Sequence, residues 1–180
     1  MKKIICLFAL LFISKANVKA QTTGIPFPEL AGETLTDKKI TIPTDTKGKY
    51  TLVGLACSRA AEGDMQKWLN PVYNKFVAKT SGMMDAAYDV NTFFVPIYSG
   101  LAQVTESIGK KNMKENTDKN FYPYLVFYKG GFKKYMEELK LKDKETPYFL
   151  LLDKDGVIVY VTSGKYTDKK MSEIEDVLNK

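Results

Sequence analysis

Residues 50–77 read YTLVGLACSRAAEGDMQKWLNPVYNKFV, and the hydrophobic pattern changes within this segment. Tyr50–Cys57 is almost entirely apolar, which is typical of a central strand covered on both faces. From about Ser58 the apolar residues recur every three to four positions, as on one face of a helix. Ser58 is a suitable N-cap, and Pro71 inside the helical pattern predicts a kink. The segment therefore predicts a buried strand that leads directly into a helix.

A second apolar run, from Asn91 to Tyr98, closes a β-α-β unit. Such a connection is right-handed, so the two strands should be parallel. Pro96 lacks a backbone donor, which predicts an edge strand or a bulge at that position. A weaker helix from Leu101 to about Asn112 and a short strand or extended piece, Tyr124–Tyr128, follow it.

The C-terminal part has the pattern of a hairpin between two helices. Gly130-Gly131 precedes a helix expected over residues 132–141, and the last helix starts at Thr167. Between them, apolar runs at residues 147–152 and 157–162 flank Asp153-Lys154-Asp155-Gly156, a strong hairpin signal. The two aspartates also suggest calcium, but the other loop ligands are missing, which favours the turn. Upstream, residues 21–49 are polar and predict an extended or hairpin lead-in.

The first twenty residues resemble a secretory signal peptide. Lys2 and Lys3 precede an apolar stretch at residues 4–13, and Ala20 ends the segment. The simplest interpretation is cleavage after Ala20, which leaves residues 21–180 as one domain and an exported, periplasmic or secreted product. The alternative is a retained membrane anchor, which needs roughly 20 apolar residues.

Removal of this segment changes the charge. The full chain has 27 basic and 21 acidic residues, and four of the lysines lie in residues 1–20. Residues 21–180 therefore contain 23 basic and 21 acidic residues, which gives a net charge of +2. The lysines are scattered, which argues against nucleic acid as a partner. No later segment predicts a stable membrane insertion.

Cysteine and histidine content restricts the chemistry. The chain has no histidine and two cysteines, of which Cys6 lies in the expected signal segment. Cys57 alone therefore cannot form an intramolecular disulfide. Without histidine, His-activated nucleophiles and imidazole-ligated metals are excluded. We expect no metal and no cofactor.

Two blocks of sequence resemble the periplasmic thioredoxin-like proteins of the TlpA and peroxiredoxin superfamily. The first is the lead-in FPELAGETL, residues 27–35, with KGKYTLV at 47–53; the second is Thr146-Pro147 followed by YFLLLDKDG. The resemblance implies a thioredoxin-like α/β fold, with a central mixed sheet flanked by helices, and a cis bond before Pro147. Residues 68–71, WLNP, are also similar to the thioredoxin-related assembly factors of mitochondrial ATP synthase, which need no dithiol.

The resemblance places the expected pair of active-site thiols near Ala60 and Gly63, and neither residue carries sulfur. Dithiol exchange within this chain is therefore excluded. Cys57 lies two or three residues too early, at the end of the predicted strand. It is either a small apolar core residue or a reactive thiol.

Other residues around this position are candidates for binding. Arg59 is the only arginine and falls near the helix N-terminus, where it either holds a carboxylate or phosphate or is a solvated surface residue. In the superfamily, the backbone beside the proline pairs with an extended peptide. The candidate binding residues are Ser58, Arg59, Ala60, Gly63, Thr146, Pro147 and Tyr148, with Trp68 as a further aromatic residue that is either groove or core.

The preferred hypothesis is a module without dithiol redox activity that binds a protein or peptide in the cell envelope through the Pro147 face and assists assembly. The alternative is an enzyme, a single-cysteine thiol oxidoreductase or peroxidase that uses Cys57. The second alternative is a small-anion binder at Arg59.

Overall fold

A four-stranded mixed sheet forms the centre of the protein. The computed structural model describes residues 22–78, 88–97 and 106–180. The strands of this sheet are β3 (Tyr50–Ala56), β4 (Val90–Pro96), β6 (Tyr148–Leu152) and β7 (Ile158–Ser163), in the order β4-β3-β6-β7. β3 pairs with β4 in parallel and with β6 antiparallel, and β6 and β7 form a hairpin. β4 is an edge strand, as Pro96 predicts.

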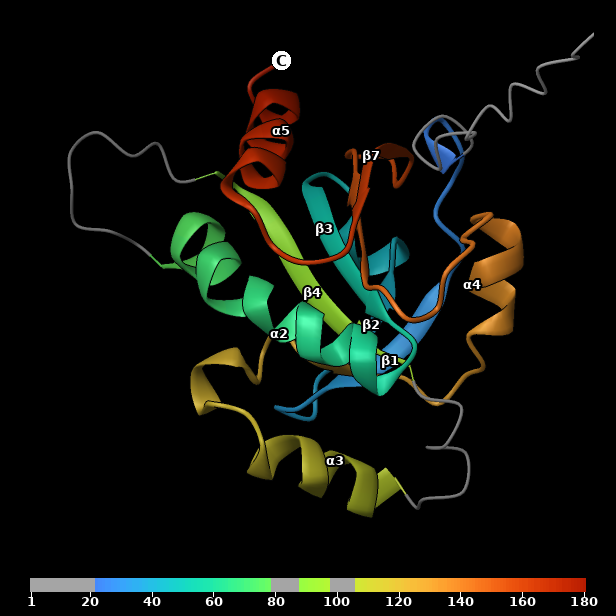
Figure 1. Ribbon diagram of the computed structural model, residues 1–180, viewed down its shortest axis with the longest axis vertical. Helices are drawn as coiled ribbons and strands as arrows, with labels where there is room; N and C mark the ends of the chain where they lie inside the picture. The colour runs from blue at the N-terminus through green and yellow to red at the C-terminus, as the bar shows by residue number, and fades with distance from the viewer. Residues whose placement is uncertain (1–21, 79–87, 98–105) are drawn as a thin grey trace, which may run out of the picture.

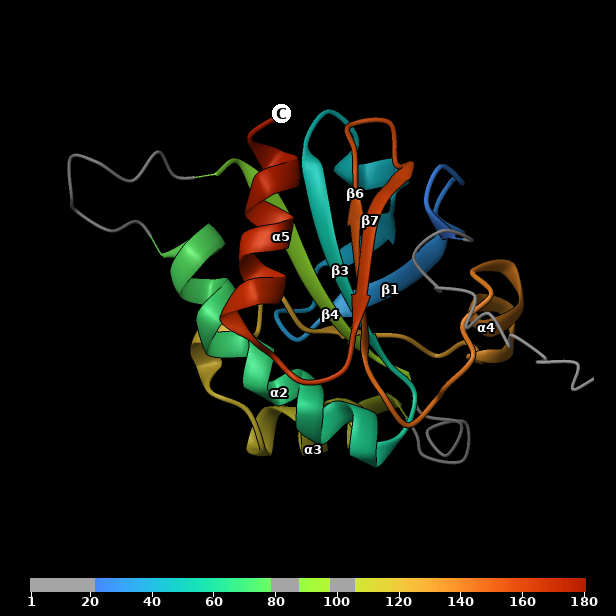
Figure 2. The ribbon, with the colours of Figure 1, turned by 45° about the horizontal axis from the view of Figure 1, so that its top comes forward.

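A second, smaller sheet comes from the lead-in. β1 (Leu30–Thr34) and β2 (Lys39–Ile42) form the expected hairpin, and β5 (Val126–Phe127) pairs with β1 on its other side. This sheet packs behind the central one in Figures 1 and 2. The short helical turns η1 (Thr44–Thr46) and η4 (Lys119–Phe121) connect these elements.

Helices cover both faces of the central sheet. α2 (Arg59–Val72) and α5 (Asp168–Leu178) lie on one face, while α4 (Lys133–Glu138) and the lead-in lie on the other (Figures 1 and 2). α3 (Glu106–Glu115) runs beside α2 at the lower edge of the molecule. No helix in the described part of the chain is long and apolar enough to cross a bilayer.

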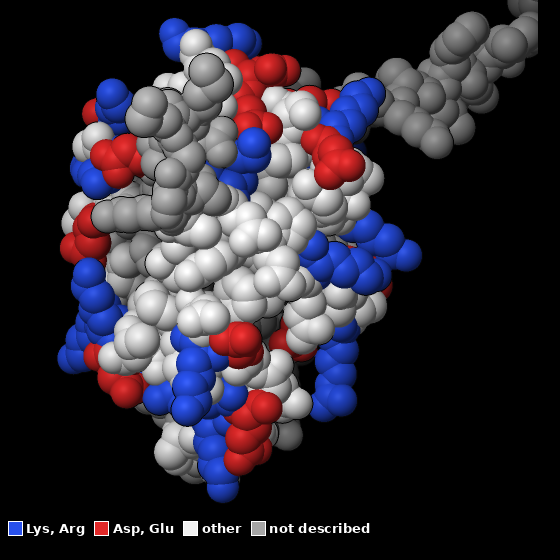
Figure 3. Space-filling view, turned by 90° about the vertical axis from the view of Figure 1, so that its left-hand side faces the viewer, with Lys and Arg blue, Asp and Glu red and all other residues white. Residues whose placement is uncertain are grey.

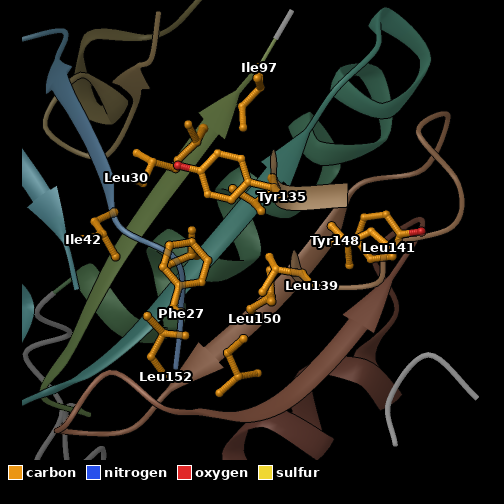
Figure 4. Packing of buried hydrophobic residues seen from close by; sticks show 14 of the residues in the cluster. Phe27, Leu30, Ile42, Ile97, Tyr135, Leu139, Leu141, Tyr148, Leu150 and Leu152 are labelled. Carbon is orange, nitrogen blue, oxygen red and sulfur yellow. The ribbon is translucent and has the colours of Figure 1, made fainter. Parts of the chain in front are cut away.

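Two hydrophobic cores result, one on each face. Alternation along β3 sends Leu52 and Ala56 to the core under α2, and Val53 and Leu55 to the core under α4. The residues labelled in Figure 4 belong to the second core and come from the lead-in, the end of β4, α4, the segment after α4, and β6. In the first core, the Trp68 ring stacks on Phe149 with centroids 4.0 Å apart. Trp68 is fully buried, so the core interpretation of this residue is confirmed.

The structure refines several predictions about element ends. Pro71 lies inside α2, and beyond Val72 the helix continues as a π-helix, η2 (Tyr73–Val77). α3 ends at Glu115, later than expected, and residues 101–105 at its start lie outside the described residues. The expected signal segment, residues 1–20, also lies outside them.

The expectation of a cis peptide bond before Pro147 is wrong. Ile42–Pro43 is the cis peptide bond in the described part of the chain, and the Thr146–Pro147 bond is trans. A bend over residues 144–146 leads the chain into β6, and the Pro147 carbonyl accepts a hydrogen bond from the Gly164 amide at 2.8 Å. The turn at Asp153 is confirmed: Asp153 Oδ1 accepts the Asp155 and Val157 amides, and Gly156 has a φ of 87°.

The packing at Gly54 generates a stability prediction. A Cβ at Gly54 would lie 2.8 Å from Phe149 Cε1, and that ring cannot move away because it stacks on Trp68. We expect Gly54→Ala to lower the free energy of unfolding by about 1–3 kcal/mol, measured by chemical denaturation followed through the fluorescence of Trp68, the single tryptophan.

Gly63→Ala is the matched control. A Cβ there meets nothing within 4 Å, and the residue lies inside α2, so alanine should raise stability by about 0.5–1 kcal/mol. Equal effects of the two substitutions would contradict the packing described for Gly54.

Candidate functional site: a groove between two helices

A groove of about 770 Å³ lies between α2 and α3. It begins where β3 passes into α2 and continues along one side of that helix. The residues that line it are Cys57, Ser58, Arg59, Glu62, Met65, Gln66, Leu69, Pro96, Gly109, Asn112, Met113, Asn116, Thr117, Leu125, Lys144 and Glu145. It therefore combines residues from both helices, the end of β4, the segment before β5 and the loop before β6.

The α2 wall follows directly from local sequence. Ser58 is the N-cap, as predicted, and its Oγ accepts the Ala61 amide at 3.1 Å. Arg59, Glu62, Gln66 and Leu69 then follow at helical spacing along one side. The helix itself is held by burial of its opposite side, where Trp68 Nε1 donates to the Gly164 carbonyl at 3.0 Å. This wall is therefore fixed by the core.

The α3 wall is fixed mainly by polar contacts on its far side. Lys110 Nζ lies 2.8 Å from Glu33 Oε1 and 3.5 Å from Asp37 Oδ1, at the β1–β2 hairpin. Lys114 also pairs with Asp37, and the Tyr122 hydroxyl donates to the Lys114 carbonyl at 2.7 Å. α3 thereby turns its lysines away from the groove. Figure 3 shows the side of the molecule at the left of Figure 1, where charged side chains of both signs surround a central uncharged area.

Cys57 closes one end of the groove, and its thiol is nearly buried and hydrogen-bonded. The residue is 9% exposed, and its Sγ donates to the Lys144 carbonyl at 3.0 Å. Burial, together with the carboxylates of Glu145 and Asp143, raises the pKa of the Cys57 thiol to about 12. At neutral pH the sulfur is therefore protonated. The geometry supports the core interpretation of Cys57 over the reactive one.

The structure brings together only part of the candidate binding residues. Ser58 and Arg59 line the groove, and Arg59 is exposed without a hydrogen bond or ion pair to any residue in the described ranges. Ala60 and Gly63 are exposed on α2 but do not line it.

The residues around Pro147 lie outside the groove as well. Thr146 is half-buried, and Pro147 and Tyr148 are buried. Tyr148 is 2% exposed within the core of Figure 4, where its hydroxyl accepts the Asp143 amide at 2.9 Å. The loop just before these residues, at Lys144 and Glu145, is what borders the groove.

Sequence reasoning missed the α3 wall and the apolar floor. Gly109, Asn112, Met113 and Asn116 recur at helical spacing, which is a detectable pattern of one helix face. Nothing in that pattern indicates which element the face lies against. In the described ranges there is also no group of three His, Cys, Asp or Glu side chains suited to a metal ion.

Comparisons with known proteins agree with this fold. The family model described as ATP10 protein matches residues 10–180. No curated protein matches the chain. Three solved structures have similar folds: the exposed lipoprotein thioredoxin Etrx1 from Streptococcus pneumoniae strain TIGR4, a putative thiol:disulfide interchange protein DsbE from Chlorobium tepidum, and a DsbF homologue from Corynebacterium diphtheriae.

The match to Etrx1 has 17% identity and a TM-score of 0.53 and covers 84% of this chain and 98% of the other. The DsbE protein is 15% identical with a TM-score of 0.53, and the match covers 87% of this chain and 96% of the other. The DsbF homologue is 17% identical with a TM-score of 0.54, and the match covers 84% of this chain and 85% of the other. At these identities the likeness concerns the fold alone, which is thioredoxin-like, as predicted.

The environment of Cys57 predicts slow alkylation. In the native protein at pH 8, iodoacetamide should modify Cys57 at least about a hundredfold more slowly than in the denatured chain, because the native thiol is protonated and buried. The native rate should rise only as the pH approaches 12. Mass spectrometry of the peptide that contains Cys57 measures this separately from Cys6. Equal native and denatured rates would contradict the geometry described here.

Proposed function

The chain belongs to the ATP10 protein family, and we propose that it is an assembly factor that binds a segment of a partner polypeptide in the α2–α3 groove, without dithiol chemistry. The observation that carries this proposal is the combination of a thioredoxin-like fold with a large groove whose one sulfhydryl is buried and hydrogen-bonded to a backbone carbonyl. A groove of this size with no reactive group is suited to binding.

The composition of the groove fits a polypeptide. Its floor is apolar, with Met65, Leu69, Met113 and Leu125 all less than a tenth exposed. Its rim carries the side-chain amides of Gln66, Asn112 and Asn116, which donate and accept hydrogen bonds as a peptide backbone does. An apolar floor with amide groups at the rim binds extended chain by burying side chains and pairing with its backbone.

The enzyme alternative requires a thiolate at Cys57. The chain has no second cysteine in residues 21–180 to resolve a mixed disulfide and no histidine to activate the thiol. Burial and the two nearby carboxylates raise the pKa of Cys57, opposite to the shift that a nucleophilic cysteine needs. The observations therefore favour binding over thiol chemistry.

We further propose that the protein acts in the cell envelope as an exported, periplasmic or secreted product. The pattern of residues 1–20 supports export, with cleavage after Ala20 and residues 21–180 as the mature domain. Assembly of envelope proteins is a task in which a binding module meets segments of chain that are not yet folded or paired.

Site-directed photocross-linking tests this proposal. We expect p-benzoylphenylalanine placed at Gln66 or at Asn112 to form an adduct with the same partner polypeptide in cells, because these exposed residues lie on opposite walls of the groove. The adduct should persist when Cys57 is replaced by alanine, since no mixed disulfide is involved. Denaturing electrophoresis and mass spectrometry of the adduct provide the measurement.

Two positions on the same helices serve as controls. Ala60 on α2 and Ile108 on α3 are exposed but lie outside the groove, so the probe at either position should give no such adduct. Adducts of equal yield at all four positions, or an adduct that disappears in Cys57→Ala, would refute binding in the groove without thiol chemistry.

A further inference from the structure

The charged residues that line the groove lie at one end of it, and this distribution restricts the kind of segment that the groove can bind. Four charged residues line it in the described part of the chain: Arg59, Glu62, Lys144 and Glu145. They come from the first turn of α2 and from the loop before β6, and they are two of each sign. From Met65 onward along α2, every lining residue is uncharged, and so is every lining residue from α3.

The separation of charged from uncharged residues is clear in α3, because this helix is highly charged but lines the groove with uncharged residues only. The segment Glu106–Glu115 contains Glu106, Lys110, Lys111, Lys114 and Glu115. Lys110 and Lys114 pair with acidic residues of the β1–β2 hairpin, and Lys111 pairs with Glu115 at 3.8 Å. The groove side of α3 presents instead Gly109, Asn112 and Met113. Among the described residues that line this part of the groove, a charged occupant would find no partner of opposite sign.

The floor beneath this uncharged part favours apolar side chains of a ligand. Met65 and Met113 lie one on each side, with Leu69 and Leu125 beside them. Methionine side chains are unbranched and polarizable, so such a floor adapts to apolar side chains of different shape.

The length of the groove sets the size of the segment. From Arg59 to Leu69 the helix rises about 15 Å. An extended chain covers this distance with about four or five residues at roughly 3.3 Å each. The groove therefore holds a short stretch of extended chain.

From these observations we infer that the α2–α3 groove selects an extended segment of about five residues, and that the part of the segment beside the uncharged walls from Met65 to Leu69 is itself uncharged and carries an apolar side chain such as methionine. This inference rests on the proposed function and names the class of segment that the groove binds. A charged side chain in that part of the segment would lose its hydration among uncharged walls.

Four capped pentapeptides test the inference. They are Ser-Gln-Met-Gln-Ser, its two versions with Glu or with Lys in place of both Gln residues, and Ser-Gln-Ser-Gln-Ser. Each is titrated into the ¹⁵N-labelled protein, and the side-chain amide signal of Gln66 reports binding. We expect the neutral methionine peptide to bind about tenfold more tightly than each of the other three. Replacement of both Gln residues places a charge beside the uncharged walls in either orientation of the peptide, and Glu differs from Gln in charge alone. The peptide without methionine lacks the apolar side chain that the floor would bury.

Variants of α3 provide the matched comparison. Asn112→Lys and Asn112→Glu each place a charge on the groove wall at an exposed position, and both should weaken binding of the neutral methionine peptide at least about fivefold. Ile108→Lys adds the same charge as Asn112→Lys on the same helix, where the side chain is 51% exposed outside the groove, and should leave the affinity unchanged.

The outcomes separate this inference from the proposed function. If the Glu or Lys peptide binds as tightly as the neutral one through the same Gln66 signal, the groove binds polypeptide but the inference is overturned. If none of the peptides shifts a signal at millimolar concentration, the inference is overturned as well. The proposed function is then decided by the photocross-linking experiment, which does not depend on the composition of the bound segment.

Discussion

The burial of β3 between two strands and under two layers is the constraint on which the rest of the structure depends. β3 pairs along its whole length with parallel β4 and over five residues with antiparallel β6. From Thr51 to Ala56 every residue is buried. A strand of this kind has no freedom to shift, because a slip of one residue would exchange its two apolar faces. The point at which the strand ends and α2 begins is therefore fixed in space.

This fixed junction places the first turn of α2, which carries no sulfur atom, at the end of the central strand. The first turn of the helix is where backbone N–H groups favour a thiolate. Here that turn carries Ala60 and Gly63 on its outer side. The sulfur of Cys57 comes before the turn and belongs to the core on the α4 side of the sheet. The thiol donates a hydrogen bond to the Lys144 carbonyl, so the loop before β6 covers the sulfur.

The two walls of the groove are held by forces of different strength. α2 is anchored by buried packing, above all by Trp68, which stacks on Phe149 and donates to the Gly164 carbonyl. α3 buries few of its side chains and depends on ion pairs with the β1–β2 hairpin, which are partly exposed and contribute little individually. Elements with few buried contacts open at the lowest free energy. A binding groove with one rigid wall and one weakly held wall admits segments of somewhat different shape.

The amino-acid sequence determined the elements and their order, since period and turn chemistry are local properties. The apolar run at Tyr50, the N-cap at Ser58 and the turn at Asp153 each identified an element that the structure contains. The absence of cysteine at positions 60 and 63, where the chain has Ala60 and Gly63, could likewise be read directly from the sequence. Tertiary structure decided which faces meet: that Asn112 and Met113 lie across from Gln66, and that Tyr148 is buried while Lys144 borders the groove. The physical reason is that a helical pattern shows which side of an element is apolar, whereas the neighbour on that side is chosen by packing between segments far apart in the chain.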